Sequence, residues 1–147
     1  MKKFITIFLL FLSYASIGWT QSSPASLVGV NIIGDFRNLN LNQTNTDNVV
    51  AITAPRYTIR RITVANCSTS LAASAATIGV FTAAGGTGSN IVALAVLTTI
   101  ALSDDVKDLA LLLTTKSFTA QTIYIRNGVA HGSAATCDVR IFGEPLP

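Results

Sequence analysis

The sequence contains one histidine, His131, which lies two residues before Ser133 in the segment VAHGSA. A serine nucleophile needs a histidine base that a carboxylate orients, and α/β-hydrolases place that serine in a G-x-S-x-G turn. No such motif occurs in the chain, so only closeness in sequence links the two residues. A lone histidine beside a glycine is typical of a turn, and we expect no catalytic residue.

Three acidic residues, Asp104, Asp105 and Asp108, form the one cluster of carboxylates in the sequence. Oxygen ligands at such spacing could hold Ca²⁺, but the D-x-D-x-D-G calcium pattern is missing and Lys107 interrupts the cluster. We interpret the cluster as a solvated turn or a helix start. The segment GGTGSN lacks the Gly-Lys-Ser/Thr of a phosphate-binding loop. The sequence therefore predicts no metal site and no cofactor.

The chain has two cysteines, Cys67 and Cys137. An even count in an exported protein favours a disulfide, which would close a long loop here. Two separate buried thiols are the alternative, because sequence alone cannot show that the two residues approach each other.

Two adjacent arginines, Arg60 and Arg61, interrupt a strand-like segment, PRYTIRRITVANCS. Before them Tyr57 and Ile59 occupy odd positions, and after them the apolar residues occupy even positions, so a regular strand cannot bury both pairs on one face. A β-bulge at Arg60–Arg61 would restore the register and turn both arginines to solvent. The alternative is a strand covered on both faces. We expect the exposed pair to contact an acidic partner or another subunit.

Tyr57 and Tyr124 are the tyrosines beyond the N-terminal segment, and Arg126 shares one strand face with Tyr124. An exposed tyrosine can serve as a platform for a ligand or partner, whereas sheet packing is the alternative role. Together with Arg60 and Arg61, Tyr124 and Arg126 are the predicted partner-contact residues.

The first residues, MKKFITIFLLFLSYASIG, have the layout of a secretory signal peptide: a basic start, an apolar run and small residues. A buried N-terminal helix or an uncleaved anchor is the alternative. We divide the chain into an apolar leader helix at 1–18, a linker at 19–26 and one domain at 27–147. Loss of the leader would leave eight basic against seven acidic residues, so the formal charge of +3 gives no evidence of nucleic-acid binding. We expect no membrane association after its removal.

The remaining sequence is rich in Val, Ile and Thr, with Gly, Asn and Ser clusters between short apolar runs. This pattern predicts an all-β protein, a single jelly-roll-like β-sandwich of about eight strands. A surface loop is expected over NLNLNQTNTDN, a turn at GGTGSN, a loop or one helical turn at 103–107, and a hairpin link at HGSA. The expected strands are 27–33, 49–53, 57–66, 76–82, 90–100, 109–114, 122–130 and 135–142. Helical structure is the alternative within 90–114, where a continuous apolar run and a possible helix start at Ser103 fit either type.

Three segments carry a resemblance to small β-rich proteins of bacteriophage and prophage structural gene regions. They are APRYTIRRITVANCSTSL, GVFTAAGGTGSNIVA and TIYIRNGVAHGSAATCDVRIFG. The resemblance runs from about Val49 to Gly143 and implies a virion-associated or decoration role, with protein subunits as partners and homo-oligomers expected. The exported-looking leader departs from that pattern.

We therefore expect a non-catalytic structural or interaction module, such as a virion surface or decoration protein. A secreted bacterial β-sandwich module that recognises a glycan or a cell surface is the alternative. The protein would be extracellular if the leader is a genuine signal peptide, and part of a virion otherwise.

Overall fold

A computed structural model describes residues 31–112 and 117–147, and in these residues the chain is all-β, as the sequence predicts. The apolar leader helix and the linker expected at 1–18 and 19–26 lie outside the described residues. In the described part of the chain, no helix has the length and apolar character needed to cross a membrane. The elements are β1 (Asn31–Asn40), β2 (Thr46–Ala51), β3 (Tyr57–Ala65), β4 (Thr77–Ala83), the 3-10 turn η1 (Ala84–Gly86), β5 (Thr87–Val96), β6 (Lys107–Asp108), β7 (Thr122–Asn127) and β8 (Thr136–Pro145).

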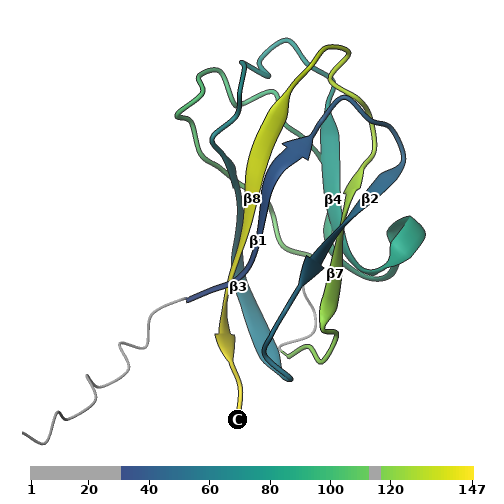
Figure 1. Ribbon diagram of the computed structural model, residues 1–147, viewed down its shortest axis with the longest axis vertical. Coiled ribbons are helices and arrows are strands. Elements are labelled where there is room, and N and C mark those ends of the chain that lie inside the picture. The colour runs from purple at the N-terminus through teal and green to yellow at the C-terminus, as the bar shows by residue number, and fades with distance from the viewer. Residues whose placement is uncertain (1–30, 113–116) are drawn as a thin grey trace, which may run out of the picture.

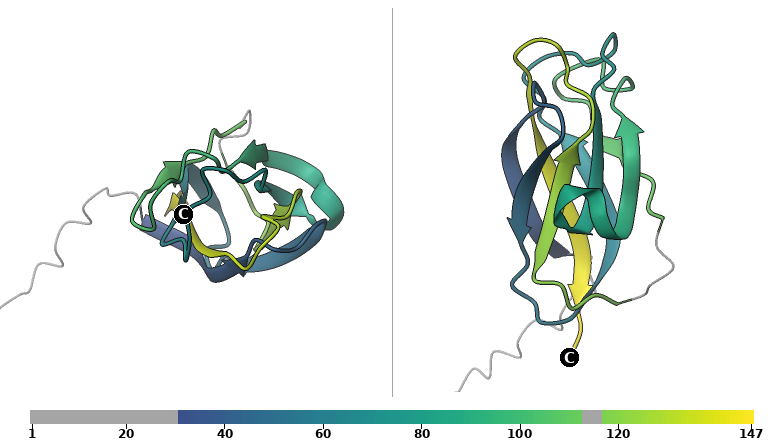
Figure 2. Two further views of the ribbon diagram at one scale, coloured as in Figure 1. Left: turned by 90° about the horizontal axis from the view of Figure 1, so that it is seen from above. Right: turned by 90° about the vertical axis from the view of Figure 1, so that its right-hand side faces the viewer.

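The strands form two antiparallel four-stranded sheets that face each other in a sandwich-like arrangement (Figures 1 and 2). Sheet A has the order β1-β8-β3-β6, and sheet B has the order β2-β7-β4-β5. The first strand therefore pairs with the last, β2 with β7, β3 with β6 and β4 with β5. Successive strands mostly belong to opposite sheets, and among the eight described strands only β4 and β5 form a hairpin.

The core lies between the two sheets because strand residues alternate between the inner and outer surfaces. In β8, Cys137, Val139 and Ile141 are buried, while the residues between them are partly exposed. In β7, Ile123 and Ile125 are buried in the same alternating way. β7 and β8 lie within or overlap the strands expected at 122–130 and 135–142, and each buries one face.

The surface loop expected over NLNLNQTNTDN is wrong at both ends, because its first three residues belong to β1 and its last three, Thr46–Asn48, belong to β2. β1 continues to Asn40, and the side chains of Leu39 and Leu41 are almost fully buried. Two register shifts in the pairing of β1 with β8, at Ile32/Gly34 and Phe36/Leu39, break the period-two pattern. Leu39 and Leu41 nevertheless alternate with exposed asparagines, and the high asparagine content of the segment is what favours a loop in the sequence.

The strand expected at 109–114 is also wrong in its described part. The strand here is only the two residues of β6, which pair with Thr63 and Val64, and Leu109 to Leu112 follow without strand structure. The expected loop at 103–107 is present as a turn, since Asp105 N–H donates to the Leu102 carbonyl. The preceding strand, expected to reach residue 100, ends at Val96.

The hairpin predicted between the last two strands does not form. β7 belongs to sheet B and β8 to sheet A, so the HGSA segment connects the two sheets. The inward face of β7 ends with Asn127, whose side chain is buried and donates to the Asn40 carbonyl, whereas Val129 is half-exposed. The last inward side chain of β7 is therefore an amide, and the apolar Val129 lies at the surface beyond the end of the strand.

Candidate functional site

The adjacent arginines lie at a bulge in β3, as the change of parity predicts. Ile59 is opposite Gly143 and Arg61 is opposite Phe142, which leaves Arg60 as the extra residue. Both arginines are exposed on the outer face of sheet A. A bulge thus lets the strand keep its apolar side chains in the core without burying a guanidinium.

Each of these arginines is paired with a carboxylate of its own sheet. Arg60 Nη2 lies 3.1 Å from Glu144 Oε2, and Arg61 Nε lies 2.6 Å from Asp108 Oδ1. The guanidinium of Arg61 also lies over the Phe142 ring, 5.8 Å from its centroid. The expectation that the pair meets an acidic partner stays a prediction, but these pairs already supply countercharges.

A second group of charges continues across the outer face of sheet A. Asp35 lies 2.8 Å from Arg37 Nε and 3.8 Å from Arg140 Nε, and Arg140 Nη2 lies 3.8 Å from Asp138 Oδ2. The Asn66 side chain donates to Asp138, and this bond lowers the pKa of the Asp138 carboxyl despite the opposing effect of burial. The charges on this face therefore largely balance one another.

The outer face of sheet B has a different character. Val49, Tyr124, Phe81 and Asn90 form one cross-strand row, from β2 through β7 and β4 to β5. Phe81 is almost buried because its ring lies across the backbone of Gly79, where an added Cβ would come within 2.8 Å of Phe81 Cε2. Tyr124 is partly exposed and Val49 is 55% exposed.

Asp47 and Arg126 are the only charged residues in the four strands of sheet B, and they form an ion pair. Arg126 Nη1 lies 3.0 Å from Asp47 Oδ1, and Arg126 Nη2 donates to the Asn45 side chain. The second oxygen of Asp47 accepts the Gly85 N–H. Gly86 packs close to the Arg126 side chain, so the pair holds the turn η1 onto the sheet.

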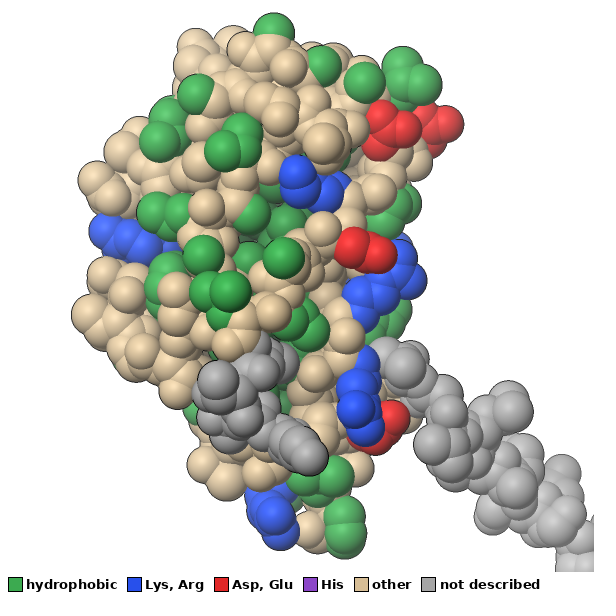
Figure 3. Space-filling view, turned by 180° about the vertical axis from the view of Figure 1, so that it is seen from behind, with side chains coloured by type: hydrophobic (Ala, Val, Ile, Leu, Met, Phe, Trp, Pro, Cys, Tyr) green, Lys and Arg blue, Asp and Glu red, His purple; other side chains and the backbone are tan. Residues whose placement is uncertain are grey.

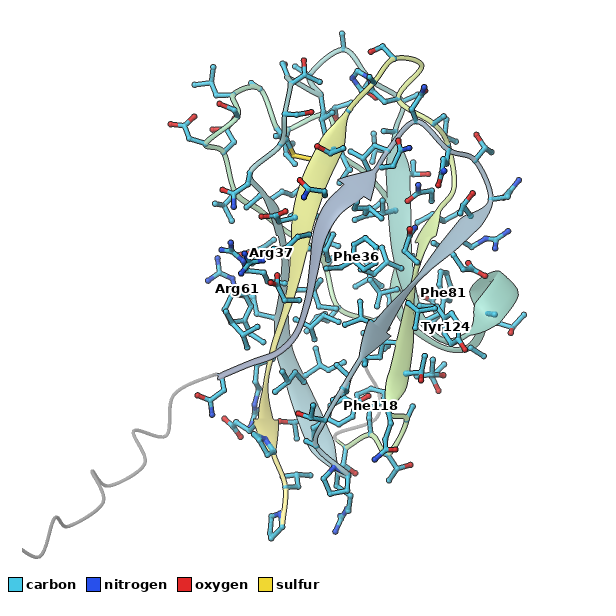
Figure 4. All side chains as sticks on the ribbon, viewed as in Figure 1. Phe36, Arg37, Arg61, Phe81, Phe118 and Tyr124 are labelled. Atoms are coloured by element: carbon cyan, nitrogen blue, oxygen red, sulfur yellow. A yellow bond between two sulfur atoms is a disulfide. The ribbon has the colours of Figure 1, made fainter. Side chains whose placement is uncertain are left out.

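The four predicted partner-contact residues therefore fall on two opposite faces. Arg60 and Arg61 lie on sheet A, and Tyr124 and Arg126 lie side by side on sheet B. Figure 4 shows Arg61 on one flank of the molecule and Phe81 with Tyr124 on the other. In Figure 3 most acidic and basic side chains follow the edge on the side of sheet A. Sequence reasoning missed Asp47 and Phe81, since only strand register shows that they neighbour the other two.

Cys67 and Cys137 form a disulfide, which confirms the predicted pairing. Both residues are buried, and the bond joins the segment after β3 to β8. The chain reaches this position through Asn66, whose φ of 50° lies in the left-handed region. Two hydrogen bonds between Ser68 and Thr136 continue the contact.

The remaining chemical candidates do not assemble into a site among the described residues. His131 Nδ1 lies 2.9 Å from Ser133 Oγ, but neither side chain has a hydrogen bond to a carboxylate there. Asp105 accepts the N–H groups of Ala101 and Leu102, as expected of a turn residue. No group of three or more His, Cys, Asp or Glu residues in 31–112 and 117–147 is arranged to hold a metal ion.

Tyr57 has a packing role. Its side chain is fully buried, its ring stacks with Phe118 at a centroid distance of 5.8 Å, and its hydroxyl donates to the Ala120 carbonyl. Burial raises the pKa of the Tyr57 hydroxyl to about 12. Of the two candidate tyrosines, only Tyr124 is therefore accessible to a partner.

No protein-family description matches this sequence, and no curated protein matches it.

Proposed function

We propose that the chain is a jelly-roll, non-catalytic interaction module that serves as a virion surface or decoration protein. The observation that carries the proposal is the strand pairing, β1 with β8, β2 with β7, β3 with β6 and β4 with β5. A folded ribbon of eight strands wrapped into two sheets gives this order, which is that of the double-sheet jelly roll. Viral capsid domains and lectins share this architecture, so the fold supports surface roles of this kind.

The chemistry of the two outer faces supports a role in binding rather than turnover. The carboxylates of sheet A are engaged in ion pairs with arginines, and the one carboxylate in the strands of sheet B is paired with Arg126. A general acid or base is usually a group with a perturbed pKa in a concave site. Tyr57 and Asp138, whose pKa values do shift, serve packing and a surface network instead.

The disulfide supports a final location outside the reducing cytoplasm. Disulfides persist on virion surfaces, on cell surfaces and in secreted proteins, and they are rare among cytosolic proteins. Cys67 and Cys137 are bonded here, and both lie in the core. The disulfide agrees with either an exposed virion protein or a secreted module.

Fractionation of the producing culture tests the proposal. Particles are separated from free protein on a density gradient, and peptides of this chain are quantified in each fraction by mass spectrometry. We expect the chain to co-sediment with particles at a constant ratio to the other particle proteins. Recovery only as free protein, with a mature N-terminus near residue 16 or 19, would overturn the virion role.

The alternative is a secreted module that binds a glycan, and Tyr124 is the feature that favours it. This partly exposed tyrosine neighbours Arg126, and Arg126 with Asn45 and Asp47 forms a polar group beside it. Aromatic rings next to polar groups suit sugar rings. Loss of glycan-array binding in Tyr124→Ala would support this alternative. Tyr57→Phe is the control, because it changes a buried tyrosine and should leave the binding unchanged.

A further inference from the structure

An apolar corner at one end of sheet B is formed by Leu94 and Val96 of β5 and by Val129, which follows β7. Their exposed fractions are 50%, 45% and 47%, so each of these large apolar side chains is about half-exposed. They surround Thr77 and Gly128: an added Cβ on Gly128 would come within 2.8 Å of Leu94 Cδ2, Val96 is opposite Thr77, and Val129 N–H donates to Thr77 Oγ1. The three side chains therefore form one surface.

The outer face of sheet B carries a second, separate group, Val49 and Tyr124, beside the ion pair of Asp47 with Arg126. Val49 and Tyr124 lie toward the opposite edge, and the turn η1 stands between the two groups. The right-hand view of Figure 2 shows this turn in front of the sheet, with the upper ends of β4 and β5 uncovered. The only charges in these strands, Asp47 and Arg126, neutralise each other.

The edge of β5 is not itself open to an added strand at either end of this region. The Leu112 N–H donates to the Ile91 carbonyl at 2.9 Å, and Lys107 Nζ donates to the Val96 carbonyl at 2.6 Å. A lysine beside an edge strand is a common protection against strand addition. The exposed side chains are therefore available for contact through the sheet face rather than through the strand edge.

We propose that the outer face of sheet B, centred on Leu94, Val96 and Val129, is the contact surface for a second copy of this chain. This inference rests on the proposed function, because a surface lattice or decoration requires contacts between subunits. In a two-fold dimer each residue near the axis meets its own counterpart. Uncharged apolar side chains can meet their own counterparts without electrostatic repulsion.

Charge distinguishes the two sheets as candidates for this contact. Two copies meeting through sheet A would bring Arg60, Arg61 and Arg140 near the same residues of the partner, and their present carboxylates would have to be shared or desolvated. Sheet B has no unneutralised charge in its strands. The self-complementary face is therefore that of sheet B.

The size of the face sets the strength of the contact. Four strands about 4.8 Å apart and about six residues long cover roughly 400 Å² in projection, and the turn η1 covers part of this area. A stable interface usually buries about 800 Å² on each partner. We therefore expect a weak dimer that forms at high concentration and is reinforced by multiple contacts on a particle surface.

Sedimentation equilibrium of the full chain, made with its disulfide intact, tests this dimer over micromolar to millimolar concentrations. We expect reversible dimers for the wild type and at least a tenfold weaker association for Leu94→Asp and for Val129→Asp. Leu102→Asp and Val106→Asp are matched controls, because these two residues are 62% and 58% exposed in a loop outside the sheets. Both controls should dimerise as the wild type does.

Three results would overturn the inference: a wild type that remains monomeric, undiminished dimers in the sheet B variants, or equal loss in the loop controls. If an aspartate variant fails to fold, Leu94→Ser replaces it. Concentration-dependent protection of β5 amides from hydrogen exchange provides an independent measurement. Particle fractionation distinguishes failure of this dimer from failure of the virion role. Protein that is bound to particles but never dimerises would overturn only the sheet B contact. Protein that dimerises but is never found on particles would overturn only the virion role.

Discussion

Asp47 and Arg126 meet on the outer face of sheet B, with 3.0 Å between Asp47 Oδ1 and Arg126 Nη1. The two side chains are only 20% and 19% exposed, so this pair is more shielded than the exposed pair of Arg61 with Asp108. It also fixes the turn η1, because the second oxygen of Asp47 accepts the Gly85 N–H. This ion pair therefore connects β2, β7 and the turn η1.

Replacing Asp47 by Asn should destabilise the protein more than replacing an exposed carboxylate. The change leaves the shielded Arg126 without a countercharge, and we expect a loss of about 1–3 kcal/mol in the free energy of unfolding. Asp108→Asn is the matched control and should cost at most about 1 kcal/mol, since its ion pair is solvated. Urea unfolding followed by circular dichroism measures both. Equal losses would mean that the ion pair contributes no more than a surface pair.

A comparison of β1 with β7 and β8 shows why sequence reasoning located some strands and missed others. β7 and β8 alternate regularly, so their inward residues were predictable from period two. In β1 and directly after it, Leu39 and Leu41 also alternate with exposed asparagines, but the density of asparagine in this segment favours a loop. A period-two pattern therefore predicts a strand only where the residue types favour a strand as well.

Prediction of the candidate site needed knowledge of long-range strand pairing, even more than prediction of the strands did. Tyr124 and Arg126 share a face by simple alternation, which the sequence does show. Asp47 and Phe81 join them only because β2 and β4 both pair with β7, and strand order is set by the whole fold. The bulge at Arg60 was predictable, because the apolar parity changes within one strand.

Reduction of the Cys67–Cys137 disulfide should lower the free energy of unfolding substantially. The bond closes a loop with a sequence separation of 70, and the chain-entropy model then gives about 4 kcal/mol. Urea unfolding with and without a thiol reductant measures the difference. The Cys67→Ala, Cys137→Ala double variant controls for effects of the reductant and should be at least as unstable. An unchanged unfolding midpoint after complete reduction would contradict the prediction.

Asp138 should make the protein sensitive to acid. Its pKa is lowered from the ordinary 3.8, chiefly by the hydrogen bond from Asn66, so the ionised carboxylate favours the folded state. This stabilisation is fully present above the ordinary pKa and is lost as the pH falls through the lowered one. In Asn66→Gly, which keeps a residue suited to φ of 50°, the pKa of Asp138 should rise. NMR titration of the Asp138 carboxyl measures it, and an unchanged pKa would refute the assignment to Asn66.

Deletion of Arg60 should be tolerated, whereas deletion of a paired residue in the same strand should not. Arg60 is the extra residue of the bulge, and its removal leaves Ile59 and Ile62 on the inner face of a regular strand. We expect a folded protein that loses the ion pair with Glu144. Deletion of Thr63 instead shifts Val64 to the outer face and should prevent folding. Proton NMR dispersion and thermal melting distinguish the two outcomes, and similar behaviour of both deletions would show that register is not set by this bulge.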